Sequence, residues 1–205
     1  MKISYAITVC DEFLEIKRLL SFLLQNKRNQ DEIVVLVDLT KNDPTSELLG
    51  YLHKLSSNNY ITLVEDIFNN HFANWKNRLT RACSGDWIFQ IDADEIPHKD
   101  LIEYLPEILI SNPSMDVIRV PRVNTVQGLT EEYERRWGWE VNAMGWVNWP
   151  DFQWRIWKNH PKIKWVNKVH EVLEGYNFYS DLHKDERFSL YHPKDIERQV
   201  KQNKY

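Results

Sequence analysis

Trp87-Ile88-Phe89-Gln90-Ile91-Asp92-Ala93-Asp94-Glu95-Ile96-Pro97 joins an apolar run to a cluster of carboxylates. The run is interrupted only by Gln90, which is typical of a buried strand. Three carboxylates then fall within four residues, and Pro97 predicts the start of a helix, since a first-turn N–H has no partner to lose. Open α/β sheets bind ligands at the carboxyl ends of their strands, so this stretch predicts a binding edge.

Asp92 and Asp94 form an Asp-x-Asp pair at this edge. Alternate residues of an extended segment point the same way, so both carboxylates could reach one divalent cation and the phosphates that it holds. Hard oxygen ligands favour Mg²⁺ or Mn²⁺. The alternative is an acidic turn without a ligand, in which Glu95 or Asp94 caps the following helix.

The sequence before this stretch alternates between strand and helix patterns. Apolar runs predict strands at 3–9, 33–37, 60–64 and 87–91. Amphipathic periodicity predicts helices at 11–26, 45–55 and 72–82, the last of them ended by Ser84-Gly85. The alternation predicts an α/β fold with a mostly parallel sheet and helices on both faces. Acidic residues follow three of the strands, at Asp11-Glu12, Asp38 and Asp92, and a set of acids at one sheet edge predicts a site.

The remainder of the chain is less regular. A helix is predicted at 101–110 and a strand at 117–123, whose internal proline favours a sheet edge or a bulge. Residues 128–150 show no clear periodicity and are predicted to form a long irregular insertion over the sheet edge, as a lid or binding loop. Further predictions are an antiparallel pair of 152–157 with 163–166, an extended segment at 168–173, and a polar helix from about residue 194. We expect a single domain, 1–205, built from the halves 1–125 and 126–205.

Composition excludes several classes of protein. The chain has 205 residues and a formal net charge of −4 without a basic block, so a duplex nucleic-acid partner is not expected. No apolar run approaches the ~20 residues that span a bilayer, and no signal-peptide pattern is present, although peripheral membrane contact stays open. Cys10 and Cys83 form neither a metal pair nor a disulfide framework, so a cytoplasmic location is expected.

Tryptophan is concentrated in one region, with seven of the nine residues between positions 137 and 165. Each ring can bury a large apolar area, and for Trp157 and Trp165, in predicted strands, core packing is favoured. Trp139, Trp146 and Trp149 lie in the irregular segment, where their rings could either pack in the core or stack on an acceptor sugar.

Several segments, in order, resemble the motifs of glycosyltransferase family 2, which has the GT-A fold. The first half contains Ile7-Thr8-Val9-Cys10-Asp11-Glu12 (the family usually has Asn-Glu), Val35-Leu36-Val37-Asp38, Asn74-Trp75-Lys76-Asn77-Arg78 through Trp87, and Ile91-Asp92-Ala93-Asp94-Glu95. The second half contains Gln153-Trp154-Arg155-Ile156-Trp157-Lys158-Asn159, Lys168-Val169-His170-Glu171, and Leu190-Tyr191-His192 with the basic helix that leads to Asn203-Lys204-Tyr205. These segments resemble one branch of the family.

The resemblance implies roles for individual residues. The nucleotide-sugar-binding residues would be Thr8, Glu12, Asp38 near the base, Asn77, Arg78, Asp92 and Ala93. The ligands of Mn²⁺ or Mg²⁺ would be Asp94, His170 and His192. Apart from the resemblance, the Trp-rich segment predicts an acceptor side. We expect Trp139, Trp146, Trp149 and Asp151 to bind the acceptor, with the donor in the half 1–125 and the acceptor in the half 126–205.

Family 2 enzymes invert the anomeric configuration, which calls for one displacement and one general base. Glu171 is our first choice for that base, with Glu140 and Asp151 as alternatives. Glu171 could instead form a structural ion pair with Arg155 or Lys168. A divalent metal and Arg78 would stabilise the departing nucleoside diphosphate.

The function that follows is transfer of a hexosyl-type sugar from a nucleotide-sugar donor to a glycan or lipid-linked acceptor. A sugar nucleotidyltransferase is a rival, but it favours a Gly-rich phosphate loop after the first strand, where this chain has Cys10-Asp11-Glu12-Phe13. A non-catalytic carbohydrate-binding protein is the second rival, and the presence of Asp92, Asp94, His170 and Glu171 argues against it.

Overall fold

A mixed sheet forms the centre of the molecule. The computed structural model describes residues 1–42 and 45–202, and within them nine strands form one sheet, ordered β3-β2-β1-β4-β7-β6-β11-β5 with β10 paired to β6. These strands are β1 (Ile3–Val9), β2 (Glu32–Asp38), β3 (Thr62–Asp66), β4 (Trp87–Asp92), β5 (Ile96–Pro97), β6 (Val117–Gln127), β7 (Val147–Lys158), β10 (Tyr179–Asp181) and β11 (Leu190–Asp195). A separate antiparallel pair consists of β8 (Lys164–Val166) and β9 (Val172–Glu174).

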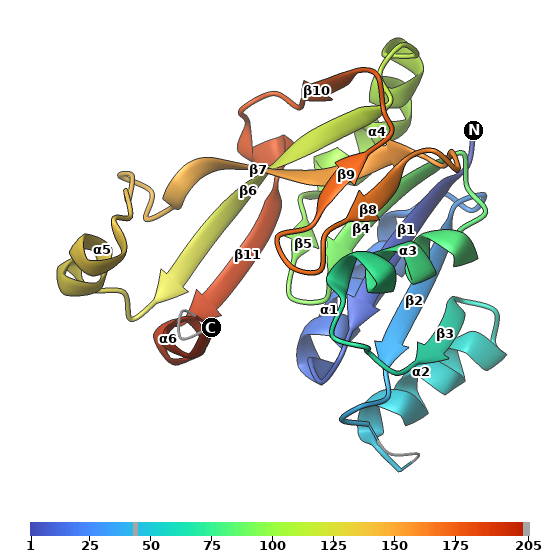
Figure 1. The fold of residues 1–205 in the computed structure, drawn as a ribbon, viewed down its shortest axis with the longest axis horizontal. Coiled ribbons are helices and arrows are strands. Elements are labelled where there is room, and N and C mark those ends of the chain that lie inside the picture. The colour runs from blue at the N-terminus through green and yellow to red at the C-terminus, as the bar shows by residue number, and fades with distance from the viewer. Residues whose placement is uncertain (43–44, 203–205) are drawn as a thin grey trace.

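Helices cover both faces of the sheet, as predicted. They are α1 (Phe13–Asn26), α2 (Glu47–Ser57), α3 (Phe72–Ala82), α4 (Lys99–Ser111), α5 (Glu131–Trp137) and α6 (Ile196–Gln202), with a 3₁₀ turn, η1 (Glu186–Phe188). One core contains the apolar sides of α1, α2 and α4, with Leu19, Leu52 and Leu105 fully buried. A second core lies under α3 and the β8–β9 pair, and Figure 1 shows α3 in front of the sheet. None of the described helices is long and apolar enough to cross a membrane.

The predicted parallel half is confirmed. β1 pairs in parallel with β2 and β4, and β2 pairs in parallel with β3, so the carboxyl ends of these strands meet at one edge. α3 also begins and ends at the predicted residues. Gly85 follows it for a different reason from the predicted helix cap. A Cβ at Gly85 would lie 2.7 Å from the backbone N of Ser4, so only glycine allows the turn into β4 to pass so close to β1.

The prediction that Pro97 opens a helix is wrong. Ile96 and Pro97 form β5, which pairs with the start of β11, and α4 begins at Lys99. The cap of α4 is His98, whose Nδ1 accepts a hydrogen bond from the backbone N–H of Asp100 at 3.1 Å. The alternative in which Glu95 or Asp94 caps this helix is therefore wrong too.

The strand predicted at 117–123 extends to residue 127 as β6 and is central rather than at an edge. Its pairing with β7 does contain two register shifts, which confirms the predicted bulge. On the other side of β6, pairing with β10 ends at Arg119 and pairing with β11 begins at Arg122. Pro121 lies in the interval between these two pairings, where the loss of an N–H donor costs little.

The predicted pairing of 152–157 with 163–166 is also wrong. The first segment belongs to β7, which runs antiparallel between β4 and β6, while the second is β8 and pairs with β9. Residues 128–150 are not irregular throughout, because they contain α5 and the start of β7. Figure 1 shows α5 at the far end of the long β6–β7 pair.

Strand β11 was not expected from the sequence. It runs parallel to β6, with His192 beside Asn124, and it precedes the predicted polar helix, which begins at Ile196 as α6. Because β11 returns the chain to the sheet, it brings the last described residues back to the edge where β1, β2 and β4 end.

Candidate active site

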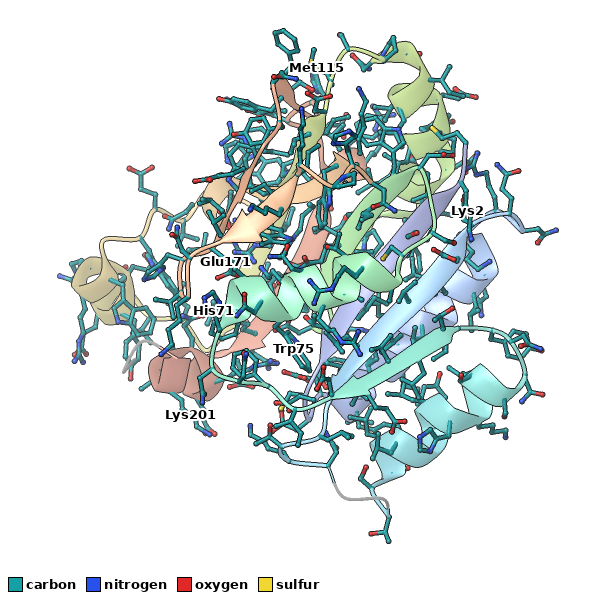
Figure 2. All side chains as sticks on the ribbon, turned by 45° about the vertical axis from the view of Figure 1, so that its right-hand side comes forward. Lys2, His71, Trp75, Met115, Glu171 and Lys201 are labelled. Carbon is teal, nitrogen blue, oxygen red and sulfur yellow. The ribbon has the colours of Figure 1, made fainter. Side chains whose placement is uncertain are left out.

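A cavity of about 670 Å³ opens at the carboxyl ends of β1, β2 and β4. The acids that follow these strands, Glu12, Asp38, Asp92 and Asp94, all line it, which confirms that they share one edge. Arg122 of β6 also lines the cavity, and the second half of the chain contributes Glu171, His192, Lys194 and Arg198. In Figure 2, Glu171 and Trp75 mark the wall of the cavity beside α3.

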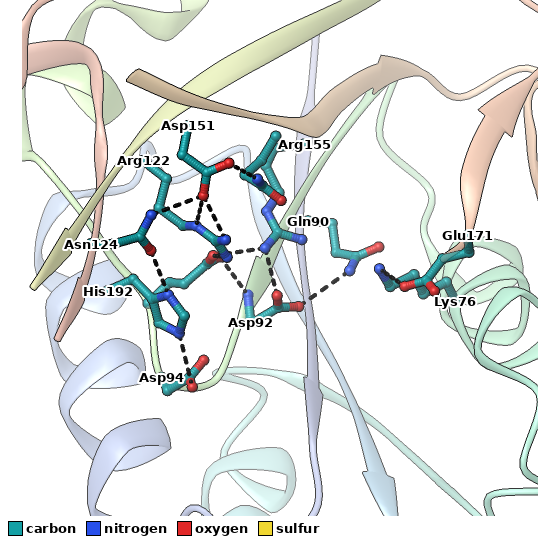
Figure 3. A network of polar contacts seen from close by, with 12 residues as sticks. Lys76, Gln90, Asp92, Asp94, Arg122, Asn124, Asp151, Arg155, Glu171 and His192 are labelled. Carbon is teal, nitrogen blue, oxygen red and sulfur yellow. Dashed lines mark hydrogen bonds and ion pairs between the residues drawn. The ribbon is translucent and has the colours of Figure 1, made fainter. Parts of the chain in front are cut away.

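The acidic turn after β4 is held from beneath by arginines. Glu95 is fully buried and accepts hydrogen bonds from Arg155 Nη2 at 2.7 Å and Arg122 Nη1 at 3.1 Å. Its other oxygen accepts from the backbone N–H of Asp92 at 3.1 Å. Glu95 therefore fixes the shape of the turn, and the two aspartates remain at the cavity surface (Figure 3).

Asp92 is paired with the same buried arginine. Arg155 Nη2 lies 2.5 Å from Asp92 Oδ2, and the Arg155 side chain is only 4% exposed. Burial raises the pKa of Asp92, but the charge of Arg155 outweighs it and holds the pKa below its usual range. Asp92 is thus ionised and has a fixed orientation.

Asp94 has different partners, both of them in the cavity wall. His192 Nε2 lies 3.2 Å and Arg198 Nη2 lies 3.1 Å from Asp94 Oδ2. Burial raises the pKa of Asp94, and the hydrogen bond and charge of His192 more than offset this, so the pKa is lowered. A carboxylate, an imidazole and a guanidinium therefore meet at one oxygen atom.

A relay of hydrogen bonds sets the tautomer of His192 (Figure 3). Asp151 Oδ2 can only accept, and it accepts from Asn124 Nδ2 at 2.9 Å. The Asn124 Oδ1 then faces His192 Nδ1 at 2.9 Å, which places the proton on Nδ1. In this tautomer Nε2 faces the Asp94 carboxylate, so a metal ion between the two atoms would be bound by both.

The Asp94 carboxylate and the His192 imidazole fit a divalent-cation site in which other ligands complete the coordination. Within the described part of the chain, no three His, Cys, Asp or Glu side chains form a metal-binding group. Mg²⁺ and Mn²⁺ do not need a closed cage, because substrate phosphates and waters commonly complete their coordination. Asp94 and His192 could hold such an ion. The hydrogen bond from His192 to Asn124 is the outer contact that usually orients a ligating histidine.

Asp38 lies at the other end of the cavity. Its Oδ1 accepts from the backbone N–H groups of Thr40 at 2.8 Å and Phe68 at 3.1 Å. Burial raises the pKa of Asp38, and these hydrogen bonds more than offset it, so the pKa is lowered. Phe68 contacts Phe72 and Trp75 with ring centroids 4.8 and 5.6 Å apart, so an aromatic wall stands beside the carboxylate.

Glu171 and Lys76 form an ion pair across the cavity wall. Lys76 Nζ lies 2.5 Å from Glu171 Oε1 and 4.3 Å from the centre of the Trp165 ring. Both charged side chains are largely shielded from solvent, at 13% and 16% exposed. Glu171 therefore pairs with Lys76, not with Arg155 or Lys168 as the structural alternative supposed.

A second cavity of about 230 Å³ adjoins the first and shares Arg122, His192 and Lys194 with it. Trp139 and Asp151 line this smaller cavity. Asp151 is held by Arg122 Nη2 at 2.7 Å and by Gln153 Nε2 at 2.7 Å.

The sequence of this chain matches the family described as glycosyl transferase family 2 over residues 4–179. The chain belongs to glycosyl transferase family 2. No curated protein matches the sequence.

Solved structures support the fold of this family 2 chain. S. aureus TarS 1-349 in complex with UDP has a TM-score of 0.66 and 15% identity, covering 94% of this chain and 60% of TarS 1-349. The same protein in complex with UDP-GlcNAc has a TM-score of 0.64 and 16% identity, covering 95% of this chain and 59% of the other. This likeness confirms the predicted GT-A-like fold, and the chain spans about 60% of the length of these TarS structures.

The family 2 chain does not bring every predicted residue to the cavities. Asn77 bonds the backbone of Trp165 through both amide atoms, at 2.8 and 3.0 Å, and so attaches α3 to β8. Arg78 pairs with Asp66 at 3.1 Å, outside the lining of either cavity. His170 is exposed, with a φ of 53° in the turn before β9, and it lines neither cavity.

Three of the residues predicted on the acceptor side also lie outside the linings of the two cavities. Glu140 is exposed and lines neither of the two cavities. Trp146 and Trp149 pack against each other, with ring centroids 4.9 Å apart, and are likewise outside the two linings.

The structure also adds cavity residues that the sequence argument did not single out. They are Phe68, Phe72, Trp75, Lys76, Arg122, Lys194 and Arg198. Phe72 and Trp75 follow the helical periodicity of core positions, Phe68 lies in a loop, and most of the basic residues are scattered over the chain. Trp75 and Lys76 carried a signal, since they lie inside the Asn74–Arg78 motif.

Proposed function

We propose that the chain transfers a sugar from a nucleotide-sugar donor to a hydroxyl of a glycan or lipid-linked acceptor, with Mn²⁺ or Mg²⁺. The observation that carries this proposal is the site at Asp94. A carboxylate and a tautomer-fixed imidazole converge there, beside three basic side chains of the same cavity, Lys76, Lys194 and Arg198. Such a set suits a metal-bound diphosphate.

The donor would lie along the edge of the parallel half of the sheet. The base would sit between Asp38 and the aromatic wall of Phe68 and Trp75, with Thr8 and Glu12 along the cavity floor. Asp92 and Ala93 would border the ribose and the diphosphate. The TarS structures contain UDP and UDP-GlcNAc, which makes a uridine diphosphate sugar the first donor to test.

Each charged group of the cavity then has a task in the displacement. A divalent cation supplies Lewis-acid stabilisation of the leaving diphosphate when bound. Asp94 and His192 would hold that ion, while Arg155 keeps Asp92 ionised and immobile. Lys76 and Lys194 offer positive charge to the phosphate oxygens as their charge increases.

Glu171 is proposed as the general base, because it lines the donor cavity and Lys76 keeps it in place. Movement of Lys76 toward the diphosphate would release this carboxylate to accept the acceptor proton. Asp151 is the second candidate, although three side chains already donate to it. Glu140 is the weakest candidate, since it lies outside the two cavities.

The acceptor would enter through the smaller cavity, where Trp139 offers a stacking face beside Asp151. Most residues that line the smaller cavity belong to the proposed acceptor half, 126–205, and Arg122, Asn124 and Thr125 come from the donor half, 1–125. The Trp146–Trp149 pair could extend that surface outward.

Calorimetric titration of UDP, GDP and CMP, each with Mn²⁺ and with EDTA, tests the proposal. We expect one nucleotide, UDP first, to bind with Mn²⁺ and to lose most of its affinity in EDTA. Absence of binding by all three would leave a carbohydrate-binding protein as the better account. Slow donor hydrolysis without acceptor would exclude that alternative, and pyrophosphate release from a nucleoside triphosphate and a sugar phosphate would instead identify a nucleotidyltransferase.

A further inference from the structure

Arg198 reaches the cavity from α6, beyond residues 4–179 that match the family. Its backbone N–H donates to Asp195 Oδ1 at 2.7 Å, which sets the first turn of α6. Its guanidinium, 28% exposed, lies 3.1 Å from Asp94 Oδ2. Longer contacts of 3.8 and 3.6 Å join it to Glu12 and Glu15 at the start of α1. The last described helix is thereby attached to the centre of the proposed metal site.

This contact conflicts with occupation of the site by a metal. A divalent cation shared by His192 Nε2 and Asp94 would lie at Oδ2, the oxygen that Arg198 contacts, and two positive charges a few ångströms apart repel each other. The guanidinium must therefore leave this oxygen when the ion arrives. The other carboxylates within its reach, Glu12 and Glu15, are at distances where a solvent-exposed ion pair contributes little.

A diphosphate offers the displaced guanidinium a better partner. Arginine presents paired N–H donors that match phosphate oxygens. Arg122, another arginine of the same cavity, is less able to exchange its carboxylate partners for a diphosphate. Glu95 and Asp151 both pair with it, and its side chain is only 19% exposed. Arg198 has the single close carboxylate contact that the metal itself would take.

We propose that Arg198 is an exchangeable counter-ion. It neutralises Asp94 in the empty protein and moves to the donor diphosphate when metal occupies Asp94. Metal binding and nucleotide binding then depend on each other. The metal displaces Arg198 from Asp94, and the diphosphate binds the displaced Arg198. This inference rests on the proposed function, and it concerns the order and mutual dependence of ligand binding.

The test compares wild type with Arg198→Gln in two binding measurements. Removal of the competing charge should tighten the binding of Mn²⁺ alone, measured by paramagnetic resonance of the free ion, by about three- to tenfold. The same variant should bind UDP at saturating Mn²⁺ about tenfold more weakly, because a charge-assisted phosphate contact is lost. Arg198→Lys should recover part of the UDP affinity, since it keeps the charge but not the paired donors.

Arg187→Gln is the matched control, because Arg187 also pairs with a carboxylate, Asp185, but outside both cavities. It should leave both affinities unchanged. Opposite shifts for Mn²⁺ and UDP in Arg198→Gln support the exchange. Unchanged affinities, or a loss of both, overturn it, the latter because Arg198 would then only hold Asp94 in place. Failure of wild type itself to bind UDP with Mn²⁺ would overturn the proposed function instead.

Discussion

At the scale of single residues, three neighbouring acids of one turn have three different environments. Glu95 is buried under two arginines, Asp92 is held by one of them, and Asp94 contacts only groups of the cavity wall. The difference follows from the tight turn after β4, which the hydrogen bond from the Glu95 N–H to the Asp92 carbonyl closes at 2.9 Å, combined with the buried position of Arg155. Asp94 is therefore the acid whose removal should affect ligand binding most and folding least.

Asp94→Ala is expected to abolish the metal dependence of UDP binding. In calorimetry, its affinity for UDP in Mn²⁺ should equal that of wild type in EDTA. Asp11→Ala is the control, because Asp11 lies at the same sheet edge but pairs with Lys41 in an exposed position. Binding as tight as wild type in the Asp94 variant, with Mn²⁺ present, would contradict the metal assignment.

Glu171→Gln is expected to keep the affinity for UDP and to lower the transfer rate by about 10²- to 10⁴-fold, since a general base is lost. Single-turnover transfer from the donor to an acceptor sugar measures the effect. Asp151→Asn is the comparison, because that residue is the rival base at the acceptor side. If Glu171→Gln turns over normally and Asp151→Asn does not, Asp151 is the base.

At the scale of secondary-structure elements, Glu32 fastens the beginning of β2 to its neighbours. Its Oε1 accepts from Ser4 Oγ at 2.5 Å and from the backbone N–H of Ser84 at 2.6 Å. Its Oε2 lies 2.6 Å from Lys2 Nζ. The carboxylate thus links the starts of β1 and β2 and the turn before β4, at the edge opposite the cavity.

Stability should depend on pH through Glu32. Burial raises its pKa, but the bonds to Lys2, Ser4 and Ser84 outweigh this and lower it from 4.5 to about 2. Because the folded-state pKa is the lower one, the contribution is complete above pH 4.5 and is lost as the pH falls toward 2. We expect Glu32→Gln to reduce the free energy of unfolding by about 1–2 kcal/mol at neutral pH, allowing for solvent screening.

Urea unfolding of wild type and Glu32→Gln at pH 6 and pH 3 measures this effect. The difference between the two proteins should shrink at the lower pH. Glu103→Gln, at an exposed position of α4, should have the same free energy of unfolding as wild type at both pH values. A difference that is the same at both pH values would show that charge on Glu32 is not the cause.

At the scale of the whole molecule, one sheet separates two cores and ends in a cavity that both halves of the chain line. Residues from β1, β4, α3, β11 and α6 line the cavity together, so a ligand bound there would contact all of these elements. The unfolded chain cannot offer that arrangement, so ligand binding should stabilise the native state as a whole.

We expect UDP with Mn²⁺, at a free concentration of 100 times Kd, to add about 2.7 kcal/mol to the free energy of unfolding. For a chain of this size, that corresponds to a rise in Tm of about 5–10 °C. Scanning calorimetry with and without EDTA measures it, and Asp94→Ala should show no metal-dependent rise. An equal rise in EDTA would mean that nucleotide binding does not require the metal.

Local patterns were enough to predict the parallel half of the sheet and its acids. β1 and α3 have the predicted bounds, because an apolar run and a helical periodicity are patterns of residues that are close together in the sequence. The same patterns predict that Glu12, Asp38 and Asp94 lie together at the ends of strands, since parallel strands with short crossovers must end at one edge of the sheet.

The partners of those acids depended on the tertiary structure. His192 meets Asp94 across 98 residues of sequence, because β11, a strand that the sequence did not predict, pairs with β6. The antiparallel position of β7 likewise places Arg155 under Asp92. Periodicity shows which face of an element is buried, but strand order and the choice among competing ion pairs arise only from distances in the folded chain.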